Sequence, residues 1–342
     1  RPVFASYYKS ADSSRNIRFV INNGNKSLWL DSAEYCKAGY LEGKRYYELR
    51  DKLFSKGKLH ITALALAENE GAVWKIETEN FPKNFNLVSV ISKIKADKLK
   101  HLGEMGTNPP DVLEAGNKLG DVKVNFTDKK AYLLLEGAEL QQIDNKRGEI
   151  IYLKAESCAK KISEQITIRT PDKYINTVAG ALSSAADGVW DGKNAWLHGA
   201  IGWRMPLTGW RAAYTGDFLG YTDRARKHFD AYAASQVTSV EPTVSHPSQD
   251  TTLHLARAEK KWGTQMYSNG YICRSPFNSN QMHHYDMNLV YVDELLWHLN
   301  WTGDLNYARK MFPLLDRHLE WEKRNFDPDD DGLYDAYCCI WA

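Results

Sequence analysis

Acidic, basic and aromatic side chains gather between residues 186 and 217, in the stretch ADGVWDGKNAWLHGAIGWRMPLTGWRAAYTGD. Tryptophan offers a large flat apolar ring, which suits the C–H faces of sugars, and arginine can hold a carboxylate through two parallel hydrogen bonds. Hydrolysis of a glycosidic bond needs two carboxyl groups, one protonated to assist the leaving oxygen and one ionised to activate water or attack the sugar. The stretch therefore has the residue types of a carbohydrate site, with Asp217 as a candidate catalytic carboxylate.

Six further side chains of this stretch are candidate substrate contacts: Asp191, His198, Trp203, Arg204, Trp210 and Arg211. A structural network of arginine and aspartate pairs that bridges helix ends is the alternative interpretation. His198 taken alone is better explained as a hydrogen-bonded structural histidine than as a general base. Asp217 has an alternative role as the N-cap of a helix, in which its carboxylate would accept a backbone N–H.

A second candidate segment is HHYDMNLVYVDELLW, residues 283–297. Asp286 precedes an expected helix, where it could cap the helix or contact substrate as the second catalytic candidate. His283 and His284 are adjacent and diverge on regular backbone, so a two-histidine metal site is not expected, although His284 remains a candidate substrate contact. Asp293 and Glu294 are expected on a solvated or salt-bridged face of the helix.

The third segment is DPDDDGLYDAY, residues 327–337. Asp327, Asp329 and Asp331 match the first three ligand positions of a calcium loop, but Cys338 stands where such loops place a bidentate glutamate. A turn at the end of a helix is the preferred interpretation, and no metal or cofactor is expected beyond this weak calcium candidate. Tyr334 and Trp341 complete the candidate substrate contacts.

The 342 residues are more than one ordinary domain needs, so two domains are expected. Lys and Arg number 44 against 43 for Asp and Glu, a balance that argues against nucleic acid as the main partner. A mean hydropathy of −0.52 and the lack of a long apolar run argue against a membrane span. The 5 cysteines contain no C-x-x-C pair, so neither a zinc knuckle nor a dense disulfide scaffold is indicated.

The first half of the chain has the alternation of a β-sandwich, which we place at residues 1–168. IRFVIN and KSLWLD flank Asn-Gly-Asn, a hairpin signal. The other expected strands lie within residues 58–68, 71–79, 86–94, 129–140, 148–155 and 164–170.

Helical periodicity begins after Thr170, a candidate N-cap followed by Pro171 at the first helical position. We place a helical domain at residues 169–342, with further helices at 217–235, 249–262, 287–300 and 305–323. YTGD at 214–217 is repeated as WTGD at 301–304, and ARKHF at 225–229 as ARKMF at 308–312. This repeat predicts stacked units of helix, T-G-D corner and helix, with Asp304 as an N-cap.

The order of β-sandwich, linker helix, GWRMPLTGWRAAYTGD, LLWHLNWTGDLNYARKMFPLLDRHLEW and DPDDDGLYDAY resembles glycoside hydrolases of the six-hairpin, (α/α)6-toroid class. The α-L-rhamnosidase-like members, whose corresponding segment ends in GWTGD, are the nearest likeness. The resemblance covers roughly residues 165–342. It implies an α+β multidomain chain, in which the β-sandwich precedes the first part of a toroid whose cleft is lined by segments 187–217, 263–288 and 327–341.

The resemblance implies an inverting glycosidase with a two-carboxylate mechanism on an oligo- or polysaccharide. Asp217 matches the aspartate of GWTGD, which belongs to the substrate-contacting set there, whereas RMPLTGW lacks the acidic residue that the family carries before its GW. It also implies that the remaining half of the toroid, possibly a separate chain, supplies a carboxylate. A polysaccharide lyase acting on uronates and a non-catalytic glycan-binding protein remain alternatives. The chain starts at Arg1 without an initiator Met or a signal peptide, which is compatible with a processed periplasmic or secreted protein.

Overall fold

The computed structural model describes residues 1–8, 10–94, 115–199, 205–209, 211, 213–241, 249–250, 255–256, 267–280, 285–327 and 330–334. The chain divides into two compact units, Arg1–Ala185 and Ala186–Ala342, which are described one at a time. This division lies later in the chain than the boundary expected at residue 168. Mixed α and β structure with antiparallel sheets, the coarse form of the predicted fold class, is confirmed.

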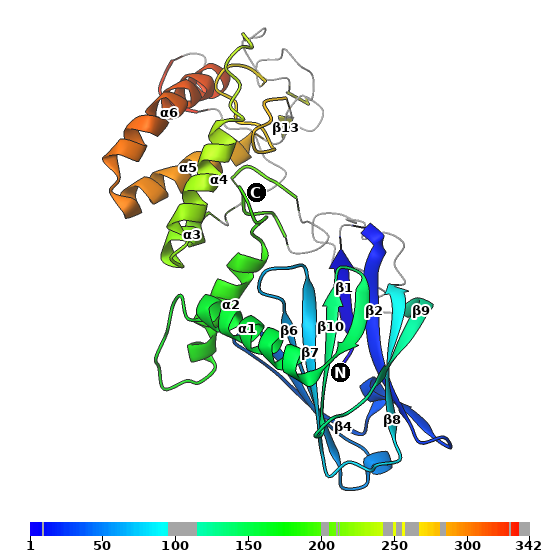
Figure 1. The fold of residues 1–342 in the computed structure, drawn as a ribbon. Helices are drawn as coiled ribbons and strands as arrows, with labels where there is room; N and C mark the ends of the chain where they lie inside the picture. The colour runs from blue at the N-terminus through cyan, green and yellow to red at the C-terminus, as the bar shows by residue number, and fades with distance from the viewer. Residues whose placement is uncertain are drawn as a thin grey trace. The chain divides into compact units, whose positions relative to one another are not determined.

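Two antiparallel sheets form most of the first unit (Figure 1). The five-stranded sheet has the order β1-β2-β8-β9, with β3 paired to β2. The six-stranded sheet has the order β11-β10-β7-β6-β5-β4. The strands of the first sheet are β1 (Phe4–Tyr8), β2 (Ser10–Asn22), β3 (Ser27–Trp29), β8 (Asn86–Ile94) and β9 (Ala115–Val124). Those of the second are β4 (Tyr35–Leu41), β5 (Lys44–Arg50), β6 (Lys58–Ala65), β7 (Gly71–Glu79), β10 (Lys130–Glu136) and β11 (Glu139–Ile143).

One hydrophobic core lies between these sheets because alternate residues of both turn their apolar side chains inward. Ile17 and Phe19 of β2 belong to the same buried cluster as Ile61 of β6 and Trp74 of β7. Phe4 joins the sheets directly, with its ring centroid 5.5 Å from that of Trp74. The Asn-Gly-Asn hairpin is confirmed, since β2 and β3 pair around Gly24, whose φ is +88°.

A helix, α1 (Asn145–Ser163), covers part of the outer face of the six-stranded sheet. Asp144 caps it by accepting the Arg147 backbone N–H at 2.9 Å. Tyr152 and Ala155 pack onto the sheet at helical spacing, so the strand predicted at 148–155 is wrong. Polar and apolar residues alternate over only a short segment there, and the cap and this packing stabilise a helix instead. Residues 164–170 follow the helix without forming the expected strand.

The remaining helices are α2 (Ile175–Gly188), α3 (Tyr214–Phe218), α4 (Thr222–Ala233), α5 (Asp286–Thr302) and α6 (Leu305–Phe326). The predicted helices at 287–300 and 305–323 are confirmed as α5 and α6. The predicted helix at 217–235 is instead divided into α3 and α4, because Gly220 adopts a φ of +76° between them. Helix α2 starts later than Pro171, since the carboxylate of Asp172 accepts the Tyr174 N–H at 2.7 Å before it.

The helix expected at 249–262 is also wrong where the structure describes it. Residues 249–250 and 255–256 form the short antiparallel strands β12 (Gln249–Asp250) and β13 (Leu255–Ala256). The sequence between them begins Thr251-Thr252, whose branched side chains disfavour helix. The other residues of this range lie outside the described part of the chain.

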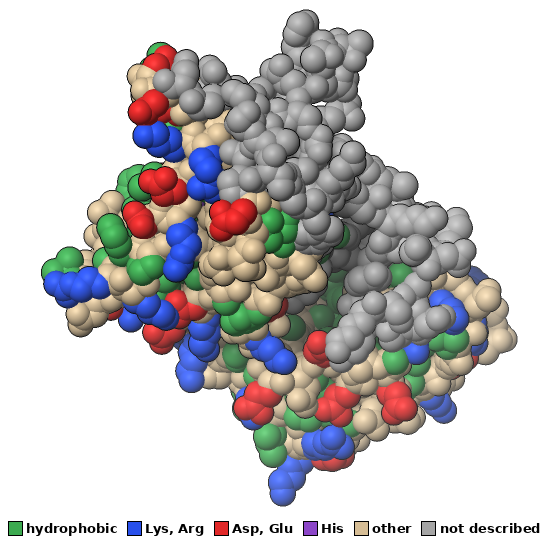
Figure 2. Space-filling model, turned by 90° about the horizontal axis from the view of Figure 1, so that it is seen from above, with side chains coloured by type: hydrophobic (Ala, Val, Ile, Leu, Met, Phe, Trp, Pro, Cys, Tyr) green, Lys and Arg blue, Asp and Glu red, His purple; other side chains and the backbone are tan. Residues whose placement is uncertain are grey.

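Short helices Leu30–Ser32 and Lys52–Phe54 also lie in the first unit. In the described part of the chain, no helix has both the length and the apolar character that crossing a membrane requires. Basic and acidic side chains are interspersed over the described surface that Figure 2 shows. This mixing agrees with the balanced composition.

Candidate functional site

The helices of the second unit have connections of very different length at their two ends. Leu219–Tyr221 joins α3 to α4, and Gly303–Asp304 joins α5 to α6. A stretch of chain from Ala234 to Tyr285 instead separates α4 from α5, and another follows α6. We call the end with the short connections the corner end, and the end at the N-terminus of α5 the loop end.

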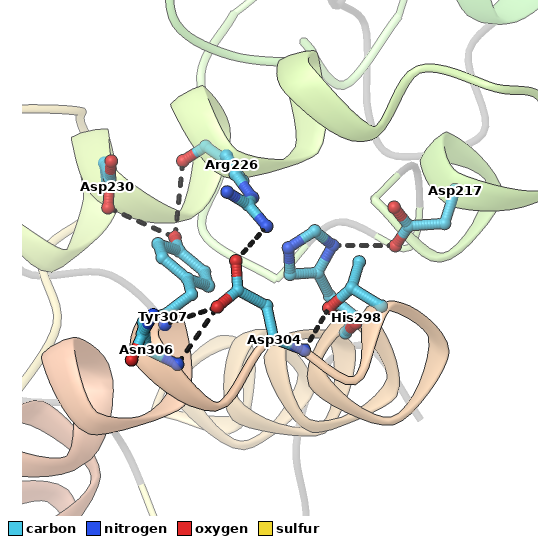
Figure 3. Close-up of polar contacts among 8 residues, drawn as sticks. Asp217, Arg226, Asp230, His298, Asp304, Asn306 and Tyr307 are labelled. Atoms are coloured by element: carbon cyan, nitrogen blue, oxygen red, sulfur yellow. Dashed lines mark hydrogen bonds and ion pairs between the residues drawn. The ribbon is translucent and has the colours of Figure 1, made fainter.

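Asp217 lies at the corner end, in a buried hydrogen-bonded contact with His298 of α5 (Figure 3). Its Oδ2 atom is 2.8 Å from Nδ1 of His298, and the two residues are 8% and 1% exposed. The rings of Phe229 and Tyr307 lie 5.2 and 5.5 Å from the His298 ring. Asp217 does not cap a helix, because it lies inside α3 and its described partner is His298.

Asp304, at the matching place of the second T-G-D corner, has the predicted capping role. Its Oδ1 atom accepts the backbone N–H groups of Asn306 and Tyr307, each at 3.0 Å (Figure 3). Its Oδ2 atom receives a hydrogen bond from Arg226 of α4. The Tyr307 N–H, followed by Arg226, lowers the pKa of the Asp304 carboxyl. The two aspartates of the repeat therefore have different partners.

Glu294 of α5 is buried beside the first corner, which corrects the prediction of a solvated face. It is 1% exposed, and burial raises the pKa of its carboxyl to about 8. The charge of Asp293 adds to this increase, while the backbone N–H groups of Ala213 and Tyr214 oppose it. Met287, Tyr291, Glu294 and His298 are buried at spacings of four, three and four residues. This helical spacing is the signal that predicts the burial of Glu294.

Asp293 is exposed, as predicted, and accepts a hydrogen bond from the Tyr214 hydroxyl of α3. Arginine and aspartate pairs also occur in this unit, as the structural alternative predicts. Arg224 contacts Asp187 at 2.8 Å, and Arg226 contacts Asp304. Neither pair uses Arg211, which is exposed.

Asp286 starts α5 at the loop end. Tyr285 occupies the N-cap position without a side-chain hydrogen bond, so the capping role considered for Asp286 is not observed. A carboxylate in the first turn still interacts favourably with the helix dipole. Its Oδ1 atom is shielded from solvent and accepts no hydrogen bond from any described residue. Donors usually satisfy such an oxygen, and Oδ1 of Asn325 at the end of α6 is in the same state.

Aromatic residues surround the start of α5. The described cluster contains Tyr267, Tyr271, Tyr285, Trp321 and Phe326. Tyr285, next to Asp286, has its ring centroid 5.1 Å from that of Phe326 at the end of α6. Asn288 fixes the preceding connection to α5, because its side-chain amide donates to the Ile272 carbonyl and accepts the Ile272 N–H.

A second polar group lies near the end of α6 and was not predicted from sequence. Nε2 of the buried His318 is 2.8 Å from Oε1 of Glu322. Burial, together with the charges of Glu322 and Asp327 and a hydrogen bond with Glu322, raises the pKa of Tyr334. Tyr334 is 46% exposed and lies beside Phe326. The i, i+4 spacing of His318 and Glu322 was the available signal.

The two catalytic candidates lie at opposite ends of one helix. Asp286 is in the first turn of α5, and Asp217 binds His298 in the last part of the same helix. Twelve residues of rise correspond to about 18 Å along the axis. Inverting glycosidases separate their carboxyl groups by about 6.5–9.5 Å. Asp217 and Asp286 therefore do not form one two-carboxylate site.

The other predicted contacts have varied surroundings. Oδ1 of Asp191 accepts the backbone N–H groups of Lys193, Asn194 and Ala195, which closes a turn. His198 is partly buried, and its backbone N–H donates to the Met205 carbonyl at 2.9 Å. Five predicted contacts lie outside the described residues: Trp203, Arg204, Trp210, His284 and Trp341.

The calcium candidate has the geometry of the predicted turn. Oδ1 of Asp327 accepts the N–H of Asp331 at 3.0 Å, and Oδ1 of Asp331 accepts the N–H of Leu333 at 2.8 Å. Asp329 lies outside the described residues, and within the described part no group of His, Cys, Asp and Glu is arranged to hold a metal.

Comparison with known proteins matches residues 13–179 to a family model described as a domain of unknown function, DUF4450. The matched residues lie within the first unit. No curated protein matches the chain. Among solved structures, a bacterial glucoamylase complexed with acarbose is similar, with 11% identity and a TM-score of 0.45. The alignment covers 92% of this chain and 53% of the glucoamylase, so the chain spans about half of that protein's length.

Proposed function

We propose that the protein is a glycoside hydrolase whose reaction takes place at the loop end of the helical unit. Asp286 supplies one of the two catalytic carboxyl groups. The observation that carries the proposal is the Oδ1 atom of Asp286, shielded from solvent and without a described hydrogen-bond donor. A substrate hydroxyl or a water molecule that donates to this atom would remove the cost of leaving it unsatisfied. The sequence resemblance to toroid glycosidases supports the choice of a glycan.

The corner end is the weaker choice for catalysis. The Oδ1 atom of Asp217 also lacks a described donor. Asp217 is nevertheless buried as a whole residue and its Oδ2 atom contacts His298, whereas Asp286 is partly exposed. The general acid or base of a glycosidase must reach the leaving oxygen or the attacking water. We therefore assign Asp217 a positioning role, in which it joins α3 to α5.

Exposed aromatic and polar groups at the loop end support binding of a sugar. Tyr334 presents part of its ring to solvent and bonds to Glu322. A ring next to a carboxylate supplies a stacking surface and a hydrogen-bond acceptor for hydroxyl groups. We propose Tyr334 as a stacking residue and Glu322 as the acceptor beside it.

We further propose that more helices complete a ring around α5 and α6 and contribute the second catalytic carboxyl group. Exposed apolar side chains on α5 support this proposal, since Leu296, Trp297 and Trp301 are all more than two-fifths exposed. A helix that is apolar on all sides is normally buried. These faces are consistent with a helical partner, either from the same polypeptide or from a second one.

The test compares Asp286→Asn with Asp293→Asn, a matched control on the same helix whose carboxylate is exposed. The protein, together with the helices that supply the second carboxyl group, is incubated with neutral and uronate-containing polysaccharides, and new reducing ends are measured. Because a general acid or base contributes about 10²–10⁴-fold, Asp286→Asn should lower the rate by at least about 100-fold. Asp293→Asn should stay near the original rate.

Equal activity of the two variants would refute the role of Asp286. A product that absorbs in the ultraviolet, formed without consumption of water, would identify a lyase instead. Binding of glycans without any new reducing ends would indicate a non-catalytic glycan-binding protein and would contradict the proposed hydrolysis.

A further inference from the structure

The outer face of the six-stranded sheet is only partly covered by α1. Strand register places three rows of side chains across this face. The row next to α1 is Gly39, Tyr46, Thr62, Lys75 and Tyr132. The second row is Lys37, Glu48, His60, Glu77 and Lys130, and the third is Tyr35, Arg50, Lys58 and Glu79. The side chains of the last two rows are polar or aromatic, as on a solvated face.

The side chain of Tyr46 extends over the glycine of the neighbouring strand. Gly39 is its direct cross-strand partner, and a Cβ atom at Gly39 would overlap the Tyr46 ring. The hydroxyl end of the ring therefore lies over bare backbone. Tyr46 is 39% exposed, so part of its side chain is open to solvent. A ring held this way is pre-ordered, which lowers the entropy cost of binding against it.

Helix α1 borders Tyr46 on one side. Lys44, two residues before Tyr46, pairs with Glu156 of α1 at 2.8 Å. Tyr152 of α1 bonds to Thr62 and lies 5.4 Å from the Lys75 ammonium. These contacts fix α1 beside the first row. The open ring consequently lies between a helix and a row of polar side chains.

Hydrogen-bonding groups continue on the other side of Tyr46. Glu48, the neighbour of Tyr46 on this face of β5, lies across from Lys37 on β4 and His60 on β6. Its Oε1 atom accepts a hydrogen bond from Arg50, and its Oε2 atom is the acceptor left for a ligand. Beyond this row, the Arg50 guanidinium lies 4.9 Å from the centroid of the Tyr35 ring. A cation thus already occupies one face of Tyr35. Tyr46 is the better stacking surface.

We propose that Tyr46 and the polar row beside it form a binding surface for an uncharged oligo- or polysaccharide, separate from the loop end of the helical unit. A sugar ring stacks its C–H face on Tyr46, and its hydroxyl groups bond to Glu48, His60 and Lys37. The mixture of acidic and basic side chains favours an uncharged ligand, because a surface for a polyanion would carry a clear excess of basic groups.

The experiment is native gel electrophoresis of the full chain in gels that contain soluble polysaccharide. The uncharged probes are xyloglucan, arabinoxylan, galactomannan and hydroxyethylcellulose, and polygalacturonate is the charged one. At least one uncharged probe should retard the protein. Tyr46→Ala should weaken this retardation by about tenfold in apparent dissociation constant, the usual scale for an aromatic anchor.

Tyr40→Ala is the matched control. Tyr40 lies on β4 with 49% exposure, but its register places it on the opposite side of the sheet from Tyr46. The Tyr40→Ala variant should bind the polysaccharide as well as the original protein does. Gly39→Ala keeps the tyrosine but places a methyl group where its ring lies, so it should also lose binding. Thermal unfolding of each variant verifies that the fold is retained.

The proposal is overturned if no uncharged probe retards the protein, if only polygalacturonate does, or if Tyr46→Ala binds as well as Tyr40→Ala. Asp286→Asn separates this inference from the proposed catalysis, because it should abolish hydrolysis and leave the retardation intact. Loss of retardation in Asp286→Asn would assign the binding to the loop end instead.

Discussion

The two aspartates of the T-G-D repeat show how one short motif can serve two purposes. Asp304 satisfies backbone N–H groups at the start of α6, whereas Asp217 is buried against His298. Removing one partner of a buried hydrogen-bonded pair leaves an unsatisfied polar group in the interior, which is typically costly. Asp217 differs from Asp304 because it contacts His298, a residue outside the T-G-D motif.

Glu294 gives a pH dependence of stability that can be measured. Burial raises the folded-state pKa of its carboxyl to about 8, above the ordinary value of 4.5, so folding favours the protonated form. The stabilising contribution is complete below about pH 4.5 and is lost as the pH rises toward 8. The loss is about 1.4 kcal/mol for each pH unit within that window.

Glu294→Gln should therefore flatten the pH dependence of the free energy of unfolding between pH 5 and pH 8. Urea unfolding at several pH values measures it. Glu320→Gln, an exposed position on α6, is the control and should keep the original slope. A slope in Glu294→Gln equal to that of the control would contradict the assignment.

At the scale of elements, α5 and α6 could be predicted because their apolar spacing is long and regular. The N-cap of Asp304 also followed from sequence. The strand predicted at residues 148–155 was wrong because eight residues of alternating polarity resembled a strand. The cap at Asp144 and the packing of Tyr152 stabilise a helix there instead. The burial of Glu294 was missed because its charge was given more weight than its helical spacing from the buried residues of α5. The position of Tyr46 over Gly39 could not be predicted, because it depends on the register between two strands.

The outer side of α6 carries a second apolar stripe. Leu305, Phe312 and Leu319 recur every seven residues and are 67%, 64% and 55% exposed. The opposite stripe, which includes Met311, Leu314 and Trp321, is buried. A helix with two apolar sides is expected to pack against a further helix.

The chain alone should therefore self-associate as its concentration rises. Charging this stripe with Phe312→Glu and Leu319→Glu should reduce association without lowering the unfolding midpoint, since both side chains are exposed. Sedimentation velocity over a range of concentrations measures the effect, and Glu320→Arg is a control on the same helix. Purely monomeric behaviour of the unmodified chain would contradict this expectation.

At the scale of the whole molecule, the two units have separate buried clusters. The sandwich core contains residues of both sheets, and the aromatic cluster of the second unit involves the end of α6 and its neighbouring connections. The family match at residues 13–179 lies inside the first unit. Both observations indicate a sandwich unit with its own source of stability.

Residues 1–185 should consequently fold when produced alone. We expect a circular dichroism spectrum dominated by β structure and one cooperative thermal transition. Tyr46→Ala in this fragment should keep the transition, whereas Ile61→Ala, at a fully buried position, should lower it, because large-to-small core changes cost about 2–5 kcal/mol. A fragment without a cooperative transition would show that the sandwich needs the second unit.

The buried contact between Asp217 and His298 also has a consequence for engineering. It ties α3 to the last turns of α5, while Asp304 and Arg226 tie α6 to α4 at the same end. Randomised libraries aimed at new ligands should leave these four positions untouched. They should instead diversify the stretches around the start of α5, where new side chains can be sampled without loosening the clamp that holds the helices together.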